Sequence, residues 1–317
     1  MAQMDDCIEV CFGKNWNYGL ICQKKYHLAK ENAMNKQECA PCHLHDQEEI
    51  RRPIIWADED ISIAQAEHLV QILSLPLTWQ KPSAPGLVLH LRREGVELFS
   101  NGDTQLRQPF YVDFHSLAPR VHHAKIQQEL LIKAAKVQAC TGNTPPILID
   151  ATAGFGEDGF LFAAAGFQVT LCEQNALIAF LLQEALIRSA QMPELALICQ
   201  RLSLHQGDSV DFLLHLDRQP AIVYLDPMFP ARQKNAKIKK KLQIMQLIEQ
   251  PCPSEQRLFA AALSVLPQKI VVKRPVKGPS LAGLTPAFFL KGKAVRFDVY
   301  LPRSMSAAVR NTILENL

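Results

Sequence analysis

The sequence predicts an α/β protein in which a doubly wound, mostly parallel sheet follows a smaller α+β domain. Three observations predict this fold class. From residue 147 onward, short apolar runs alternate with longer helical patterns, which is typical of a parallel sheet with helices on both faces. A glycine-containing loop joins the first of these runs to an apolar helix. Two strand-like runs, 288–290 and 295–300, flank Lys291-Gly292-Lys293 and indicate a closing antiparallel hairpin.

The composition is that of an ordinary globular protein, with 48% hydrophobic and 21% charged residues. We divide the 317 residues into an N-terminal extension (1–53), a small α+β domain (54–118) and a large domain (119–317). The N-terminus lacks the basic and apolar regions of a secretory signal, and no apolar run approaches the length of a membrane span. We therefore expect a cytoplasmic protein that does not contact a membrane.

The N-terminal extension is rich in cysteine. Residues 39–45, Cys-Ala-Pro-Cys-His-Leu-His, have the spacing of zinc ligands. A zinc site would need a second pair from Cys7, Cys11, Cys22 or His27, and these positions match no common zinc finger. The nine cysteines are odd in number and follow no signal peptide, so we favour free thiols in a reducing compartment. We predict no metal in the functional site.

The small domain and the segment after it have helix and strand patterns. The apolar spacing of residues 61–73 predicts a helix that Pro76 ends. A second helix is predicted over residues 121–139, where apolar side chains lie along one side. Three strands are predicted at residues 87–91, 96–99 and 110–114.

The most informative motif is the loop that follows the strand at 147–149. Pro145-Pro146 excludes a helix before that strand. Gly154 and Gly156 suit a turn in which the backbone approaches a ligand closely. A strand, a glycine loop and a helix in this order form a nucleotide pocket at the carboxyl end of a parallel strand. A plain turn between strand and helix is the alternative.

Three carboxylates in this loop indicate the charge of the ligand. Asp150, Glu157 and Asp158 would repel a pyrophosphate, whereas they suit a cationic ligand such as a sulfonium or an ammonium group. The loop therefore favours S-adenosylmethionine (SAM) over a dinucleotide.

The next two strands also end in acidic residues. Glu173 closes the strand at 168–172, about 20 residues after the first strand, where a carboxylate can bind two ribose hydroxyls. Its alternative role is a charge at a helix N-terminus. Asp208 follows the strand at 202–205 and could accept the exocyclic amine of adenine, although Asp208 or Ser209 could equally cap the next helix.

The fourth strand, 221–225, ends in Asp-Pro-Met-Phe-Pro at residues 226–230. Asp226 and the carbonyl of Pro227 can each accept a hydrogen from a planar amino group, and Phe229 can stack on the ring that bears the amine. Two acceptors would localise the lone pair of the amine and direct it at a methyl donor. The motif therefore predicts a catalytic set of Asp226, Pro227 and Phe229, with an ordinary Asp-Pro turn as the alternative.

A basic segment follows this motif directly. Residues 232–241 hold six Lys or Arg and no acidic residue. A solvated helix face is the usual meaning of such a run, but its place beside the amine-binding loop favours contact with an RNA backbone. Because the net charge is only +3, that contact would have to be local. The predicted RNA contacts are Lys234, Lys237, Lys239, Lys240, Lys241, Lys273, Arg274 and Arg296.

Four segments together resemble one bacterial family, the ribosomal RNA small subunit methyltransferase J family. They are Asp-Ala-Thr-Ala-Gly-Phe-Gly-Glu-Asp at 150–158, Tyr-Leu-Asp-Pro-Met-Phe-Pro at 224–230, Val-Lys-Arg-Pro at 272–275 and Arg-Phe-Asp-Val-Tyr at 296–300. The resemblance runs from about residue 60 to 302, in the order of the family. One departure is Glu157, where family members usually have Arg.

The resemblance implies a class I SAM-dependent methyltransferase fold, a Rossmann-like seven-stranded sheet with a C-terminal antiparallel hairpin. It implies methyl transfer from SAM to the N2 amine of a guanosine in 16S rRNA, with that RNA or the small ribosomal subunit as partner. The expected cofactor-binding residues are Gly154, Gly156, Glu157, Asp158, Glu173, Gln174, Asp208, Ser209 and Asp226.

Three alternative functions remain open at this stage. The chain could methylate an amine of another RNA or DNA base, or it could bind RNA without catalysis on a degenerate SAM fold. An NAD-dependent oxidoreductase is a further alternative, although a closing antiparallel pair does not suit a dinucleotide dehydrogenase.

Overall fold

A computed structural model describes most of the chain after the Cys-rich extension. The described residues are 53–102, 107–137, 144–227, 240–248, 252 and 254–317. The candidate zinc ligands of the extension lie outside them.

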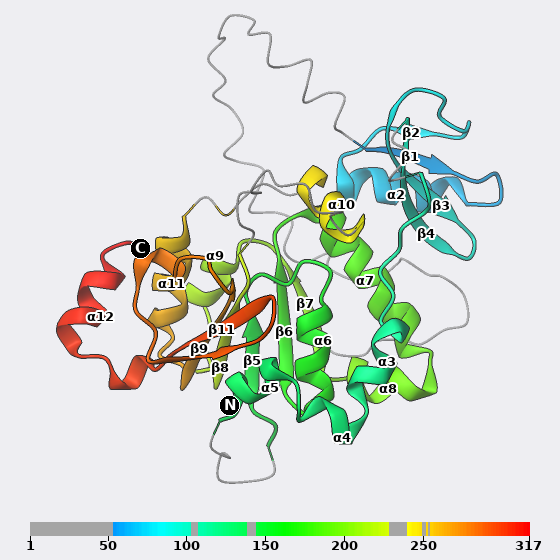
Figure 1. Ribbon diagram of the computed structural model, residues 1–317. Coiled ribbons are helices and arrows are strands. Elements are labelled where there is room, and N and C mark those ends of the chain that lie inside the picture. Colours follow the sequence, from blue (N-terminus) through cyan, green and yellow to red (C-terminus); the bar gives the residue numbers. More distant parts are fainter. Residues whose placement is uncertain (1–52, 103–106, 138–143, 228–239, 249–251, 253) are drawn as a thin grey trace, which may run out of the picture.

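The large domain is built on a seven-stranded sheet with the order β10-β11-β9-β8-β5-β6-β7 (Figure 1). Five strands of this sheet are parallel to one another. In sequence order they are β5 (Ile147–Asp150), β6 (Gln168–Glu173), β7 (Leu202–Gln206), β8 (Ile222–Leu225) and β9 (Lys269–Pro275). The hairpin of β10 (Phe288–Lys291) and β11 (Val295–Tyr300) adds to β9 in the antiparallel sense. The predicted Rossmann-like sheet with its closing hairpin is confirmed.

Helices cover both faces of this sheet. Successive strand residues point to opposite faces, so Leu148 packs into one hydrophobic core and Ile149 into a second. The first core is shared with α5 (Leu130–Ala135), α6 (Glu157–Ala164), α7 (Ala176–Ala190) and α8 (Pro193–Cys199). The second is shared with α9 (Ser209–Leu214), α11 (Glu255–Ser264), α12 (Ala307–Leu314) and the 3-10 helix η2 (Leu281–Gly283). Another 3-10 helix, η3 (Pro302–Ser304), follows β11.

The small domain is a four-stranded sheet covered by one helix. Its strand order is β2-β1-β3-β4. Ser62 caps α2 (Ile63–Leu73) in a capping box with Gln65, which explains where the predicted helix begins. The strands are β1 (Ile54–Ala57), β2 (Leu77–Thr78), β3 (Gly86–Arg92) and β4 (Gly95–Asn101).

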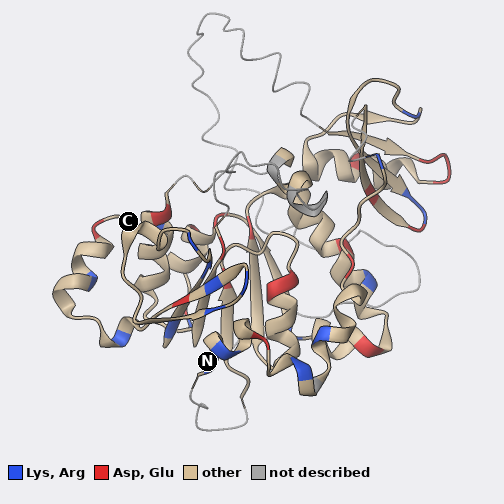
Figure 2. Ribbon diagram, in the orientation of Figure 1, with Lys and Arg blue, Asp and Glu red and all other residues tan. Residues whose placement is uncertain are grey.

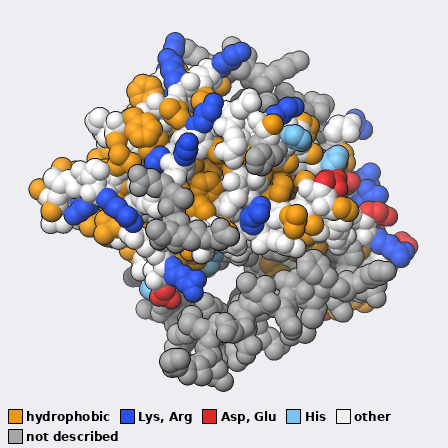
Figure 3. All heavy atoms as spheres, turned by 90° about the horizontal axis from the view of Figure 1, so that it is seen from below, with side chains coloured by type: hydrophobic (Ala, Val, Ile, Leu, Met, Phe, Trp, Pro, Cys, Tyr) orange, Lys and Arg blue, Asp and Glu red, His pale blue; other side chains and the backbone are white. Residues whose placement is uncertain are grey.

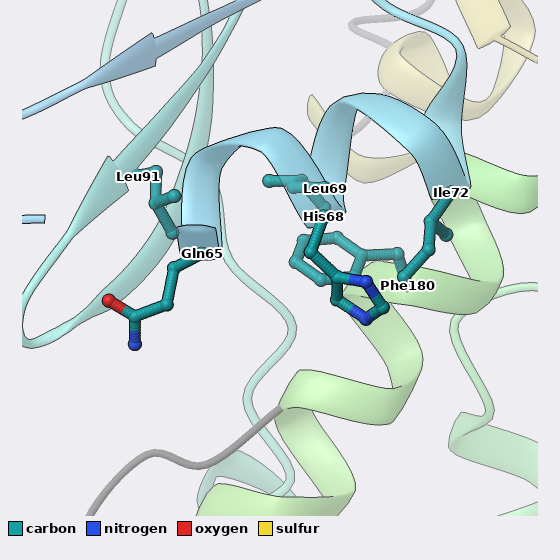
Figure 4. A pocket seen from close by; sticks show the side chains of 6 residues that line it. All are labelled: Gln65, His68, Leu69, Ile72, Leu91 and Phe180. Atoms are coloured by element: carbon teal, nitrogen blue, oxygen red, sulfur yellow. The ribbon is translucent and has the colours of Figure 1, made fainter. Parts of the chain in front are cut away.

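The small domain packs against α7 of the large domain. Leu69 of α2 is buried in the same core as Leu181 and Leu182 of α7. Figure 4 shows α2 facing Phe180, with a hollow of only about 10 Å³ between them. Because the core is continuous, the two domains form one packed unit.

The prediction of one helix over residues 121–139 is wrong. The described part of this segment contains α3 (Ala118–Val121), α4 (His123–Ile126) and α5, interrupted at His122 and Glu129, whose ψ angles are both 131°. The two interruptions let both Ile126 and Leu131 reach the core. Arg120 pairs with Glu129 across them, with 2.8 Å between Nε and Oε1.

The prediction of a strand over residues 110–114 is also wrong. Among these residues only Phe110 makes a β-bridge, to Leu98. The chain then leaves the sheet, because Phe114 is buried and stacks on Phe160 of α6 at 4.5 Å between ring centroids. The 3-10 helix η1 (His115–Leu117) begins directly after it. The chain thus buries the Phe114 ring against α6 instead of extending the sheet.

Within the described part of the chain, no helix is both long enough and apolar enough to span a membrane.

Candidate active site

The candidate site lies at the carboxyl ends of β8, β5, β6 and β7, which are neighbours in the sheet. A parallel arrangement brings the loops after these strands to one edge. Acidic residues stand at the start of α6 on this edge (Figure 2). The four acidic residues predicted at strand ends therefore lie along the same edge of the sheet.

The glycines after β5 adopt the conformations that the motif predicts. Gly154 and Gly156 have φ angles of 53° and 76°, which side chains rarely tolerate. A Cβ on Gly156 would lie 2.6 Å from Leu182 Cδ1. A Cβ on Gly159 would lie only 2.2 Å from Leu171 Cδ2, so this third glycine lets α6 pack closely on β6.

Helix α10 (Lys240–Ile248) lies against this glycine loop. The Met245 Cε is 2.9 Å from the position that a Cβ on Gly154 would take. Ile248 O accepts a hydrogen bond from Asn175 Nδ2 at 3.1 Å, at the N-terminus of α7. Helix α10, which follows the Asp-Pro-Met-Phe-Pro motif in the chain, thus covers the loop after β5.

Glu173 is buried at the end of β6 and faces the glycine loop. Its Oε2 accepts from Gly154 N at 2.9 Å, and its Oε1 accepts from Asn175 N at 2.7 Å. Burial raises the pKa of Glu173 above its ordinary value, while these backbone hydrogen bonds oppose the rise. The carboxylate is therefore held in one orientation beside the loop, where the ribose role was predicted.

Asp208 caps helix α9, as one of its two predicted roles requires. Its Oδ1 accepts from Val210 N at 2.8 Å. The cap also fixes the carboxylate at the edge of the sheet, so the cap and adenine roles are compatible. Of the flanking predicted residues, Gln174 is exposed and Ser209 is half-buried.

The backbone of Asp226 is hydrogen-bonded to the loop after β5. The Asp226 N donates to Thr152 Oγ1 at 2.6 Å, so the loops after β8 and β5 are bonded directly. The Asp226 carboxylate is partly exposed, and Pro227 is buried. Phe229 and the rest of this motif lie outside the described residues.

Lys273 joins two of the carboxylates. Its Nζ lies 2.7 Å from Asp158 Oδ2 and 2.9 Å from Asp226 Oδ2, and the Tyr224 hydroxyl donates to the same Asp158 oxygen at 2.6 Å. Burial alone would lower the pKa of Lys273, but Asp226 and Asp158 outweigh it and the pKa lies above its ordinary value. The pKa of Tyr224 is also above its ordinary value, in this case because burial disfavours the charged phenolate, so the hydroxyl stays protonated and donates.

Sequence reasoning missed this network of Tyr224, Asp158, Lys273 and Asp226. The alignment of neighbouring strands could have revealed it. Val272 of β9 pairs with Leu225 of β8, so the next residues, Lys273 and Asp226, also lie side by side.

Asp150 adds a further carboxylate beneath the loop. It is almost fully buried, and burial raises its pKa well above the ordinary value, helped by the nearby Asp158. Its Oδ1 accepts from Thr152 N at 3.2 Å. Asp150 therefore shapes the turn that also holds Asp226.

The described residues predicted to contact RNA have internal partners instead of forming an exposed basic surface. Arg274 is buried and bonds to Glu255 and to the carbonyl of Pro279. Arg296 makes two hydrogen bonds to Asp298 and others to carbonyls of the turn at 275–278. Lys234, Lys237 and Lys239 lie outside the described residues, and of Lys240 and Lys241 only the backbone of α10 is described.

Comparisons with known proteins agree with the fold. A family model described as "Putative SAM-dependent methyltransferase" matches residues 71–302. A solved SAM-dependent methyltransferase from Neisseria gonorrhoeae superposes with a TM-score of 0.61 at 30% identity, covering 80% of this chain and 98% of that chain. The fold and the site thus define a SAM-dependent methyltransferase, with SAM as its cofactor.

Curated relatives specify the family. A ribosomal RNA small subunit methyltransferase J from Aeromonas salmonicida is 38% identical over 254 residues, which are 80% of this chain and 99% of that protein. Its counterpart from Thioalkalivibrio sulfidiphilus is 36% identical over 255 residues, 79% of this chain and 98% of that protein. The chain belongs to the ribosomal RNA small subunit methyltransferase J family.

The residues at the carboxyl edge fit SAM. Glycines without Cβ atoms let the backbone approach the cofactor, and the fixed Glu173 carboxylate can accept the ribose hydroxyls. Glu173, Asp158 and Asp226 carry more negative charge than Lys273 neutralises, which favours a cationic sulfonium. Bound there, SAM supplies an activated methyl group. No group of three or more His, Cys, Asp or Glu suited to a metal ion is present among the described residues.

Proposed function

We propose that this enzyme transfers the methyl group of SAM to the N2 amine of one guanosine in 16S rRNA of the small ribosomal subunit. The relatives named ribosomal RNA small subunit methyltransferase J support the RNA substrate. The observation that carries the chemistry is the hydrogen bond from Asp226 N to Thr152 Oγ1, which holds the amine-binding motif beside the cofactor loop.

Asp226 and Pro227 would orient the amine. The Asp226 carboxylate and the Pro227 carbonyl each accept one N–H, which turns the nitrogen lone pair toward the methyl group, and Phe229 would stack on the guanine. In the transfer a nitrogen–carbon bond forms as the sulfur–carbon bond breaks, and the sulfur keeps the bonding electron pair. The amine then loses one proton, to Asp226 or to water.

RNA contact would fall to the lysines that lead into α10, from Lys234 to Lys241. Helix α10 lies against the glycine loop, which supports placing the end of the basic segment near the bound cofactor. Among the described residues on the face seen from below, Lys and Arg side chains are scattered between hydrophobic and uncharged ones (Figure 3). A local basic segment at the active edge therefore suits the low net charge of +3.

The direct test is transfer of labelled methyl from SAM to small-subunit rRNA that lacks its own modifications, followed by nucleoside analysis. We expect label in N2-methylguanosine, lost in Asp226→Ala and retained in Asp217→Ala, which changes an exposed aspartate on another loop. Label in another nucleoside, or in DNA, would refute the proposed substrate while leaving the fold and cofactor in place.

A further inference from the structure

A second hollow lies on the small domain, away from the cofactor loop. It is an open depression of about 460 Å³ on the protein surface. Two tryptophans, two carboxylates, an amide and an ammonium group line it: Trp56, Trp79, Asp58, Glu59, Gln80 and Lys81.

The indole of Trp56 is held as a flat platform. On one side it stacks on His90, its direct neighbour on β3, with 3.7 Å between ring centroids and 1° between the planes. His90 is fixed in turn by Asp58, whose Oδ1 lies 2.8 Å from His90 Nε2. Phe99 of β4 contacts both rings edge-on at 6.4 Å. The platform is therefore rigid before any ligand arrives.

Trp56 itself lines the hollow, together with Lys81. Lys81 Nζ lies over the Trp56 ring, 5.7 Å from its centroid, and Lys81 is exposed. Trp79 is 39% exposed at the rim, so a second aromatic surface borders the same space. Glu59, also exposed, adds a hydrogen-bond acceptor.

We infer that this hollow binds one unpaired nucleobase of the RNA substrate, stacked on Trp56 and bordered by Trp79. Flat aromatic side chains are the usual platform for unpaired bases, Lys81 can pair with the adjoining phosphate, and Glu59 can accept an exocyclic N–H. This inference rests on the proposed function, because it assumes that the substrate is RNA.

A cationic peptide side chain fits the hollow less well. Its charge would seek the open face of Trp56, and the protein already places the Lys81 ammonium there. A neutral base meets no such repulsion, and it can displace the exposed Lys81 side chain from the ring toward the adjoining phosphate. The small domain also lies at the same end of the molecule as α10, which covers the cofactor loop, so one RNA could reach both sites (Figure 1).

Tryptophan fluorescence gives a direct test. The chain has three tryptophans, so in a Trp16→Phe background only the two at the hollow emit. We expect a guanosine-containing single-stranded oligoribonucleotide to quench this emission. Trp79→Ala and Lys81→Gln should each weaken binding by roughly tenfold, in line with the loss of one stacked base or phosphate contact, with SAM binding unchanged. Lys133→Gln, at an exposed lysine of α5, is the matched control and should bind normally.

Several results would overturn the inference: no quenching by RNA, equal RNA affinity in Trp79→Ala and the control, or stronger quenching by an arginine-rich peptide than by RNA. Methyl transfer is measured separately. Normal transfer with an unchanged KM for rRNA in Trp79→Ala would refute this site and leave the proposed function standing. RNA quenching that persists while rRNA is not methylated would refute the proposed function alone.

Discussion

Lys273 Nζ lies 2.9 Å from the carboxylate of Asp226, the group proposed to accept a hydrogen bond from the substrate amine. The two residues end neighbouring parallel strands, β9 and β8. Partial burial raises the pKa of Asp226, and the Lys273 ammonium opposes that rise. Lys273 is therefore a positioning residue that keeps Asp226 ionised and aligned.

Lys273→Met should shift the pH dependence of methyl transfer. Without the ammonium group the pKa of Asp226 rises further, so Asp226 becomes ionised only at higher pH, and the acidic limb of the kcat profile moves to higher pH. Lys273→Arg keeps the charge and should hold the limb near its original position. An acidic limb that stays in place in Lys273→Met would show that this contact does not tune Asp226.

Glu173→Gln should weaken SAM binding and remove part of its pH dependence. Burial raises the pKa of Glu173 above its ordinary value of 4.5, so the carboxylate gains a proton, and loses ribose affinity, at a higher pH than an exposed glutamate would. We expect the Kd at neutral pH to rise roughly tenfold or more, as for a lost charged hydrogen bond. Calorimetric titration across acidic pH checks this, with the exposed Glu194→Gln as control.

The same group affects folding with the opposite sign. The unfolded chain releases the Glu173 proton at a lower pH than the folded chain does, so its ionisation costs stability as the pH rises through the raised pKa.

If Glu173→Gln and the wild type lost SAM affinity in parallel on acidification, the role assigned to Glu173 in SAM binding would be wrong.

Tyr224→Phe should lower the free energy of unfolding by about 1 kcal/mol, because it deletes the buried hydroxyl that donates to Asp158. Denaturant unfolding measures this. Tyr111→Phe, which changes a half-exposed ring, should cost little. Equal effects at the two positions would mean that the Tyr224 hydroxyl contributes nothing specific.

Gly159→Ala should destabilise the fold by about 1–3 kcal/mol, because the new Cβ would lie 2.2 Å from Leu171 Cδ2. Leu171→Ala removes that methyl group, so the double variant should cost clearly less than the sum of the two single variants. Strict additivity in this cycle would show that the close approach of α6 to β6 is not the cause.

Local sequence patterns were enough to predict the strands of the large sheet and the acidic residues that end them. Asp150, Glu173, Asp208 and Asp226 each follow an apolar run, and parallel strands necessarily bring such ends to one edge. The two-residue β2, by contrast, carries too few residues for a period to show. The breaks in the helix predicted over 121–139 were also missed, since they depend on which side chains reach the core.

The sequence by itself determined the strands of the large sheet in chain order, the glycine turn and the set of acidic groups, because these follow from periodicity and backbone conformation. Only the tertiary structure decided how the charges are paired. Lys273 joins Asp226 at the active edge, whereas its neighbour Arg274 turns into the interior toward Glu255. Both are basic residues in one strand, and their opposite fates arise because successive side chains point to opposite faces of a sheet whose two sides meet different partners.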